Sequence, residues 1–296
     1  CGKTYATPSR LPYRSPSRAN FEQDIFPVFS LVGNKETILR LCTSNRMEKC
    51  IPVRVGLRCR PLITKEVLEG CQTCVRFLDS CQVILGTDKA FTYDYVFAPE
   101  DSQEKVYEAT VSRLIPEIFK GYNVTVLAYG QTGSGKTFSM GTCCSLSSQN
   151  RDMGIIPRAV QDIFEGIQQR PEKVFKIKAS FLEVYKEDIL DLFNKRQEPL
   201  LIREDSTGTI KIPNLSEILV HDAKETLQLL ESGSSARRTA ATGMNALSSR
   251  SHAIFTLSIE QQAVSDEKDT TMAKFHLVDL AGSERAGKTK AQGERL

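Results

Sequence analysis

The sequence lacks the features that would direct it into a membrane or a secretory pathway. No apolar run approaches the roughly 18 residues of a membrane-spanning helix. No N-terminal stretch combines a basic start, an apolar middle and a small-residue cleavage site. The nine cysteines follow no regular framework, which is typical of reduced thiols rather than disulfides. We therefore expect a cytoplasmic protein with no membrane partner, and a nuclear location is equally compatible.

Histidine is scarce, and this argues against a structural metal site. Cys71 and Cys74 have the spacing of one zinc-ligand pair, but a structural zinc needs a second pair. The three histidines available for it are His221, His252 and His276. Buried or half-buried thiols are the simpler interpretation of these cysteines.

A basic excess in residues 51–296, internal repeats and coiled-coil heptads are also missing. The formal net charge is +3, and residues 1–50 hold eight basic and four acidic side chains. The rest of the chain is therefore close to neutral, which argues against a nucleic-acid binder that relies on bulk charge. An acidic partner must be held by local basic patches.

Residues 1–46 differ from the sequence that follows. They contain scattered proline, serine and arginine without periodicity, a composition typical of disorder. Met47 stands just before the first strand pattern. We expect residues 1–46 to be a disordered or foreign N-terminal extension, or a genuine flexible arm, and residues 47–296 to form the main domain.

From residue 53 onward, strand and helix patterns alternate. Longer strands are predicted over residues 53–59, 123–129, 174–185, 254–259 and 274–280, and shorter ones over 83–85 and 91–97. Helices are predicted over residues 103–119, 156–167 and 223–231. This alternation predicts an α/β fold with a central mixed β-sheet flanked by helices on both faces.

The strongest motif is a complete phosphate-binding loop at residues 130–137, GQTGSGKT. It follows a predicted strand and precedes helix-compatible sequence, which is the context the motif requires. Glycines allow the backbone N–H groups to turn toward phosphates. We expect Lys136 to reach the β- and γ-phosphates and Thr137 to ligate Mg²⁺.

Two later polar segments are candidates for sensing the nucleotide. Residues 279–284 (DLAGSE) follow an apolar strand, so Asp279 could hold Mg²⁺ through water and the Gly282 N–H could contact the γ-phosphate. Residues 245–252 (NALSSRSH) are too polar for a core helix, and Ser249 could supply a second hydroxyl to the metal. Arg250 and Glu284 could pair across these segments. Alone, either segment is also explained as an ordinary polar loop.

Together these motifs resemble those of the kinesin motor domain. Residues 245–252 resemble switch I, residues 279–284 resemble switch II, and residues 130–137 look like the kinesin phosphate loop. Residues 58–61 (RCRP) match the family's R-x-R-P motif. The resemblance runs from about residue 51 to the end and implies a P-loop NTPase fold of the kinesin type, with ATP and Mg²⁺ as ligands.

The resemblance also implies roles for individual residues. The phosphate loop would comprise Gly130, Gln131, Thr132, Gly133, Ser134, Gly135, Lys136 and Thr137. The adenine would be flanked by Arg58, Pro61 and Phe138, and Mg²⁺ would be held by Thr137, Ser249 and Asp279. Relatives commonly have histidine or tyrosine where this chain has Phe138, but stacking requires only an aromatic face.

The remaining implied roles concern hydrolysis. Gly282 would bond the γ-phosphate, and an Arg250–Glu284 pair would close over the attacking water. Glu284 would accept the proton and Ser248 would orient the nucleophile.

ATP is favoured over GTP because the N-K-x-D element is absent and residues 194–197 lack its acid. Within the family, residues 51–55, 86–94 and 286–290 look most like chromosome-associated kinesins.

Partners follow from the same resemblance. Arg285, Lys288 and Lys290 would face the acidic microtubule, and Lys195, Arg196, Arg203 and Lys211 lie in a second region that the family uses. Each is equally explained as a solvated charge. A parent protein would be a homodimer through a coiled coil, with chromatin binding in a tail, located on microtubules and the spindle.

Family members continue past the position of Leu296 with a switch II helix, further tubulin-binding elements, another sheet strand and a neck linker. In relatives that strand lies beside the one that contains Val53, so unpaired backbone groups and marginal folding are expected here. Three hypotheses remain: a plus-end-directed ATP-driven motor, a non-motile module that binds nucleotide or microtubules, and a nonfunctional fragment.

Overall fold

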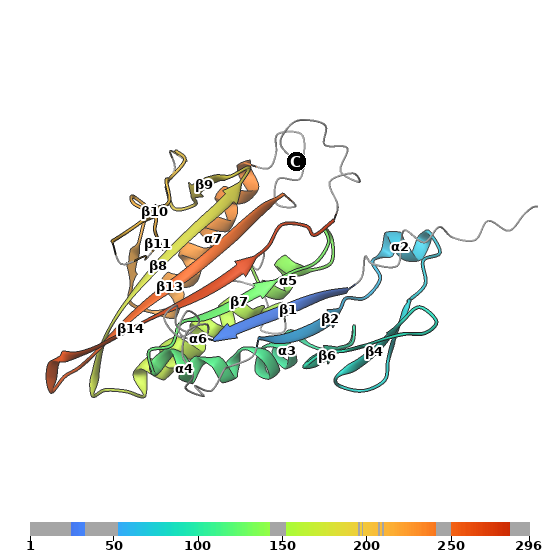
Figure 1. Cartoon of the computed structure of the whole chain (residues 1–296), viewed down its shortest axis with the longest axis horizontal. Helices are drawn as coiled ribbons and strands as arrows, with labels where there is room; N and C mark the ends of the chain where they lie inside the picture. Colours follow the sequence, from blue (N-terminus) through green and yellow to red (C-terminus); the bar gives the residue numbers. More distant parts are fainter. Residues whose placement is uncertain are drawn as a thin grey trace, which may run out of the picture.

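A computed structural model describes residues 25–32, 53–142, 152–194, 196, 198–206, 208, 210–240 and 250–284. For residues 25–32 it describes the backbone alone. Figure 1 shows one large twisted sheet with a smaller sheet beside one edge.

The large sheet has nine strands and is mixed. In spatial order they are β12 (Ile218–Val220), β8 (Lys173–Tyr185), β13 (Ser251–Ala263), β14 (Asp266–Asp279), β7 (Val124–Ala128), β1 (Ile25–Val32), β2 (Arg54–Cys59) and β6 (Tyr95–Phe97), and β9 (Asp188–Asp191) also pairs with β8. The β7–β14 and β2–β6 pairs are parallel, and the other pairs are antiparallel. The predicted mixed sheet is confirmed.

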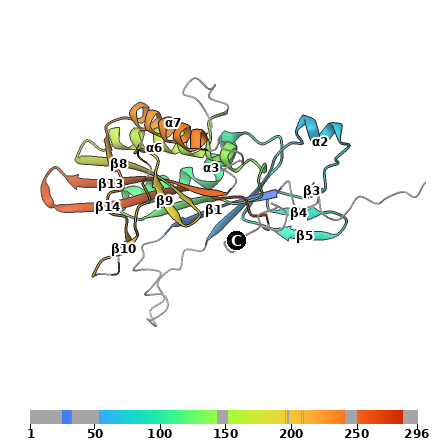
Figure 2. The same ribbon diagram turned by 90° about the horizontal axis from the view of Figure 1, so that it is seen from above.

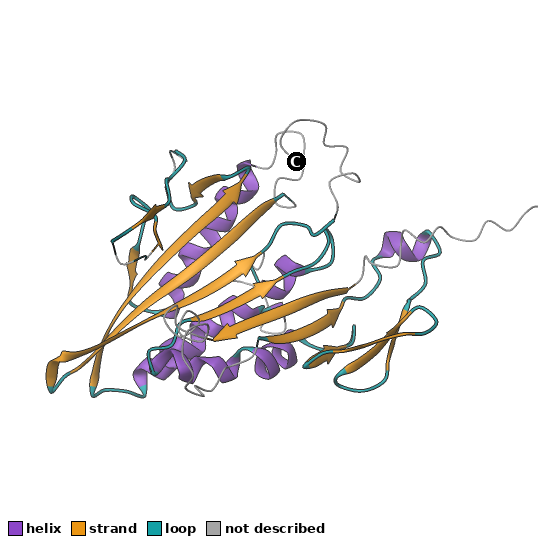
Figure 3. Cartoon of the chain, in the orientation of Figure 1, coloured by secondary structure: helices purple, strands orange, loops and turns teal. Residues whose placement is uncertain are grey.

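Two smaller sheets accompany it. β3 (Val75–Phe77), β4 (Gln82–Leu85) and β5 (Lys89–Thr92) form a three-stranded sheet, and β10 (Arg203–Glu204) and β11 (Ile210–Lys211) form a two-stranded one. α2 (Thr64–Leu68) connects the end of β2 to the three-stranded sheet, as Figure 3 shows.

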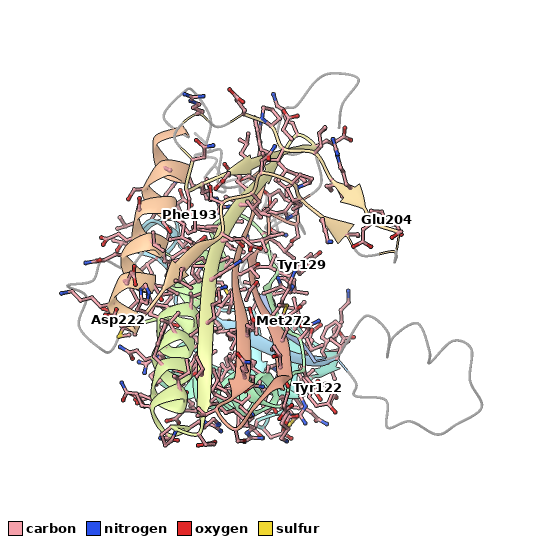
Figure 4. The ribbon with its side chains drawn as sticks, turned by 90° about the vertical axis from the view of Figure 1, so that its left-hand side faces the viewer. Tyr122, Tyr129, Phe193, Glu204, Asp222 and Met272 are labelled. Carbon is pink, nitrogen blue, oxygen red and sulfur yellow. The ribbon has the colours of Figure 1, made fainter. Side chains whose placement is uncertain are left out.

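Helices from several parts of the chain cover one face of the sheet (Figure 2). They are α3 (Gln103–Thr110), α4 (Ile115–Phe119), α6 (Ile155–Gln168) and α7 (Ala223–Ala240), with the 3₁₀ turn η2 (Ser112–Leu114) between α3 and α4. Alternate residues of β7 face this core: Val124, Val126 and Ala128 are fully buried. The opposite face carries residues such as Met272, which points away from α6 and α7 in Figure 4. None of the described helices has the length and apolarity to cross a membrane.

β13 and β14 are longer than the sequence predicted. The expected strands covered only the apolar stretches 254–259 and 274–280, whereas the hairpin continues through polar residues to Ala263 and Asp266. Gln261 is buried there, and its side-chain amide donates to Phe119 O at 2.7 Å. A polar side chain that finds a backbone partner can continue a strand, and apolar periodicity alone does not detect it.

Residues 25–32 differ from the expected disorder. They form β1, which pairs antiparallel with β2 at six positions and with β7 at five. Because β1 is antiparallel to both neighbours, β2 and β7 run parallel to each other with β1 between them. The sequence analysis expected unpaired backbone groups beside β2. β1, which precedes β2 in the chain, pairs with it there. Composition could not indicate this pairing.

Candidate functional site

The phosphate loop follows β7 and turns at three glycines. Gly130, Gly133 and Gly135 have φ values of +153°, +82° and +96°, which residues with a Cβ rarely adopt. The Lys136 ammonium donates to Gly130 O and Gln131 O, both at 2.8 Å. Burial lowers the pKa of Lys136, while the negative charges of Asp279 and Glu284 act in the opposite direction. The lysine therefore lies inside the turn of the loop.

The parallel pairing of β7 and β14 brings Asp279 to the phosphate loop. Ala128 is opposite Asp279 in the register, so the loops that follow both strands meet at one edge of the sheet. There the Thr137 hydroxyl donates to Asp279 Oδ2 at 2.8 Å. The other carboxylate oxygen, Oδ1, is buried and has no hydrogen-bond partner in the described part of the chain. A hydroxyl and a carboxylate oxygen are the donors that Mg²⁺ prefers, so the residues present fit this ion.

A buried network of charged and polar side chains contacts Asp279. Arg237 of α7 donates from Nη1 to Asp279 Oδ2 at 3.0 Å, and its Nε lies 3.4 Å from Glu183 Oε1. Arg237 also donates from Nη2 to Ser251 O at 3.0 Å, and the Ser251 hydroxyl donates to Glu183. Arg237, Glu183 and Asp279 are 5%, 1% and 3% exposed. Buried charges of this kind require partners, so the network fixes the orientation of the Asp279 carboxylate.

The sequence analysis did not identify Arg237 or Glu183. A signal existed for Glu183, because it is a charged residue in the otherwise apolar part of a predicted buried strand. Arg237 lay beyond the predicted helix at residues 223–231, which the structure extends to Ala240.

The segment after Asp279 is attached to the phosphate loop by its backbone. Leu280 N donates to Ala128 O at 3.2 Å, and Ser283 N donates to Gly130 O at 3.0 Å. Ala281 N donates to Nδ1 of His252 at 3.1 Å, which requires the neutral imidazole. Burial lowers the pKa of His252, nearby Arg237 lowers it further, and Asp279 acts in the opposite direction. His252 therefore connects the two polar segments in its neutral form.

Glu284 contacts the phosphate loop at Thr132. Its carboxylate accepts hydrogen bonds from Thr132 N at 3.0 Å and from the Thr132 hydroxyl. Burial raises the pKa of Glu284, but these bonds outweigh that effect and the net shift is downward. Thr132 thus contacts both carboxylate oxygens of the residue that the sequence analysis expected to pair with Arg250. Glu284 therefore remains ionised beside the loop.

Gly282 lies within this contact. A Cβ at this position would lie 2.2 Å from Glu284 Oε2 and 2.5 Å from Thr132 Oγ1. A side chain at this position would therefore displace the Glu284 carboxylate from Thr132. Of the other expected site residues, Ser248, Ser249, Arg285, Lys288 and Lys290 lie outside the described residues.

On its other side the loop meets the end of β2. Arg58 Nη1 donates to Gln103 Oε1 at 2.6 Å and to Ser139 Oγ at 2.7 Å. Its guanidinium lies 5.5 Å from the centroid of the Phe138 ring, within the range of a cation–π contact. Burial lowers the pKa of Arg58 to about 10, although Asp101 raises it. Arg58 thus supports Phe138 from the interior. Phe138 is 48% exposed to solvent, so a ligand could reach its ring.

Comparison with known proteins identifies the family of this chain. The sequence model described as "Kinesin motor domain" matches residues 58–296. The chain belongs to the kinesin motor domain family. Chromosome-associated kinesin KIF4 of Xenopus laevis is 55% identical over 251 residues, covering 83% of this chain and 20% of the relative. Human chromosome-associated kinesin KIF4A is 52% identical over 252 residues, with 84% and 20% covered.

The kinesin domain described here thus spans about a fifth of the length of these relatives. A solved structure described as "Structure of a fast kinesin: Implications for ATPase mechanism and interactions with microtubules" aligns with a TM-score of 0.73 at 33% identity. The alignment covers 81% of this chain and 68% of that one. The expected kinesin fold and the likeness to chromosome-associated kinesins are confirmed.

The basic residues expected near a microtubule are partly described. Arg203 and Lys211 are exposed on the small β10–β11 sheet, near Glu204 in Figure 4. Lys211 forms an ion pair with Asp205 at 3.1 Å. Arg196 is also exposed, and Lys195 lies outside the described residues.

Proposed function

We propose that this kinesin domain hydrolyses ATP with Mg²⁺ and couples hydrolysis to movement along microtubules, as a plus-end-directed, chromokinesin-like motor. One contact supports this proposal most directly. Thr137 and Asp279, from loops far apart in sequence, meet beside Lys136 with a buried Asp279 oxygen still available. A module that binds only microtubules has no need of such a pair, whereas a site for Mg²⁺ and a nucleotide does.

The phosphate loop would bind the triphosphate through its backbone N–H groups. Lys136 would transfer its hydrogen bonds from Gly130 O and Gln131 O to the β- and γ-phosphates. Thr137, Asp279 and Ser249 would hold Mg²⁺, which neutralises charge on the phosphates when bound. Arg237 would keep Asp279 oriented for this role. Most of the catalysis is positioning and charge stabilisation.

Hydrolysis would use the segment after β14. The Gly282 N–H would bond the γ-phosphate, and the ionised Glu284 would accept the proton of the attacking water. To do so, Glu284 must leave Thr132 and pair with Arg250, closing the site while Ser248 orients the water. Arg58, Pro61 and Phe138 would flank the adenine ring.

Partners of the whole protein are part of the same proposal. Arg285, Lys288 and Lys290 would face the acidic microtubule surface, in the cytoplasm and on the spindle. Homodimerisation through a coiled coil and chromatin binding, in the nucleus or on chromosomes, would belong to other parts of a longer protein.

The test is ATP turnover by the full chain with and without microtubules, compared with Lys136→Ala. We expect microtubules to stimulate turnover and the substitution to reduce it by at least about 100-fold. Turnover that is unaffected by the substitution would contradict the site. Microtubule binding without turnover would support the non-motile alternative.

A further inference from the structure

Arg60 joins the adenine side of the site to the phosphate loop. Its Nε donates to Gly133 O at 2.8 Å. Its two terminal nitrogens donate to both carboxylate oxygens of Glu66, at 2.8 and 2.6 Å. We infer that Arg60, oriented by Glu66, is a positioning residue that presets the phosphate loop for nucleotide. This inference rests on the proposed nucleotide-binding function.

Glu66 is fixed independently of the loop. It lies in the first turn of α2, and Oε2 also accepts from Ile63 N at 2.8 Å. The hydrogen bond from Arg60 is the main cause that lowers the pKa of Glu66 to about 2. The carboxylate is therefore ionised at every pH at which the protein would be assayed, and the Arg60 guanidinium stays paired.

The bond to Gly133 controls the orientation of one peptide unit. The peptide between Gly133 and Ser134 is trans, because no cis peptide occurs in the described residues, so its carbonyl and N–H point in opposite directions. The carbonyl accepts from Arg60, and Ser134 N donates across the turn to Gln131 O at 3.2 Å. Arg60 thereby fixes the loop from outside, while Lys136 contacts its carbonyls from inside.

The hydrogen bond from Arg60 restrains a peptide that Gly133 would otherwise leave flexible. Gly133 has a φ of +82° and no atom within 4 Å of a Cβ position, so local packing does not restrict the peptide. A loop that is ordered before binding loses less conformational entropy when the ligand arrives. Removing the restraint should therefore weaken nucleotide binding rather than unfold the protein.

The surroundings agree with a role outside the core. The Arg60 and Glu66 side chains are 16% and 20% exposed, and α2 has no buried residues. Lysine could not replace Arg60, because one ammonium cannot reach both Glu66 oxygens and Gly133 O in this forked geometry.

We would measure the Kd of a fluorescent ATP analogue for the full chain and its variants. Arg60→Lys should raise the Kd about tenfold, the effect of losing roughly one charge-assisted hydrogen bond. Glu66→Gln should raise it about threefold, because Arg60 remains but is less well oriented. The double variant should match Arg60→Lys alone, since Glu66 acts through Arg60.

Glu69→Gln is the matched control. It removes the same charge from the C-cap of the same helix, but its partner is Lys65 at 3.9 Å with both side chains exposed, so the Kd should not change. Values within twofold of the unaltered chain for both Arg60→Lys and Glu66→Gln, or additive effects in the double variant, would overturn the inference.

A second readout does not require nucleotide. Amide hydrogen exchange in residues 130–137 should accelerate severalfold in Arg60→Lys and Glu66→Gln, and not in Glu69→Gln. Unchanged exchange would overturn the inference even if no variant bound the analogue. Failure of the unaltered chain to bind would instead contradict the proposed function, with the exchange data still deciding the role of Arg60.

Discussion

We call the side of the phosphate loop where Mg²⁺ is proposed to bind the magnesium side. There the loop is supported by charges that are almost fully buried. Asp279, Arg237 and Glu183 are each 5% exposed or less. On its adenine side, the loop is held by Arg60 and Glu66, whose side chains are 16% and 20% exposed. Both sides use a guanidinium and a carboxylate, but water reaches only one of them.

The difference matters because burial decides what a lost charge costs. Removing one member of a buried group leaves the others desolvated and unpaired, so the fold itself should be destabilised. Removing one member of a partly exposed pair allows water to solvate the other, so less stability is lost. We therefore expect variants on the magnesium side to affect folding and binding together, and variants on the adenine side to affect mainly binding.

The largest expected effect comes from deleting residues 1–32. β1 is the element that joins β2, which leads to Arg58 and Arg60, to β7, which leads to the phosphate loop. The backbone hydrogen bonds of β1 should contribute on the order of 5 kcal/mol to the free energy of unfolding, at about 1 kcal/mol per net hydrogen bond. Pro27 adds none, because it lacks an N–H. Urea unfolding should show this loss, and ATP-analogue binding should be abolished because the two sides separate.

Deleting residues 1–24 is the control for that experiment, because it retains β1. It should leave the unfolding midpoint unchanged. Equal stability of both deletions would show that residues 25–32 do not pair with β2 and β7.

Arg237→Met should have the next largest effect. It leaves Glu183 and Asp279 buried without their shared cation, and should lower the free energy of unfolding by about 3–5 kcal/mol. Urea unfolding followed by circular dichroism would measure this. Lys178→Met is the comparison, because its partner Glu217 lies at 3.3 Å with both side chains exposed, and it should cost less than about 1 kcal/mol. Similar losses in the two variants would remove the distinction based on burial.

On both sides the sequence predicted the residues that would face a ligand better than the residues that position them. Lys136, Thr137 and Asp279 were identified because phosphate chemistry requires those residue types next to predicted strands. Glu66 was not identified and Arg60 was noted only as part of the R-x-R-P motif, because their contacts with Gly133 and with each other depend on where a short helix follows a strand. β1 was missed for a different reason: its apolar residues (IFPVFSLV) stand within a segment whose overall composition is typical of disorder.

Phe138 offers a test of binding on the adenine side. Because its ring is about half exposed, Phe138→Ala should change the unfolding free energy by less than about 1 kcal/mol. The loss of stacking should nevertheless raise the Kd for an ATP analogue about fivefold, whereas Phe138→Tyr, which retains an aromatic face, should bind normally. A large loss of stability in Phe138→Ala would show that Arg58 relies on the ring for its own burial.

The smallest expected effect is a pH dependence on the magnesium side. The folded protein lowers the pKa of His252 below its ordinary value of about 6.5, so the unfolded chain binds more protons just below that pH. Stability should therefore be fully present above about pH 6.5 and should decrease as the pH falls from there toward the folded pKa. His276 adds a change of the same direction, because burial and Lys274 lower its pKa as well.

His252→Asn separates the two contributions. Its side-chain oxygen can still accept from Ala281 N but does not titrate, so unfolding midpoints measured from pH 7.5 to 5 should depend less on pH than those of the unaltered chain. An unchanged slope would mean that His276 carries the whole effect, and that the contact between His252 and Ala281 is not tied to the charge state of the imidazole. Arg237 and Asp279 both act on the pKa of His252. A reduced slope would therefore link the charges of the buried network to the pH dependence of stability.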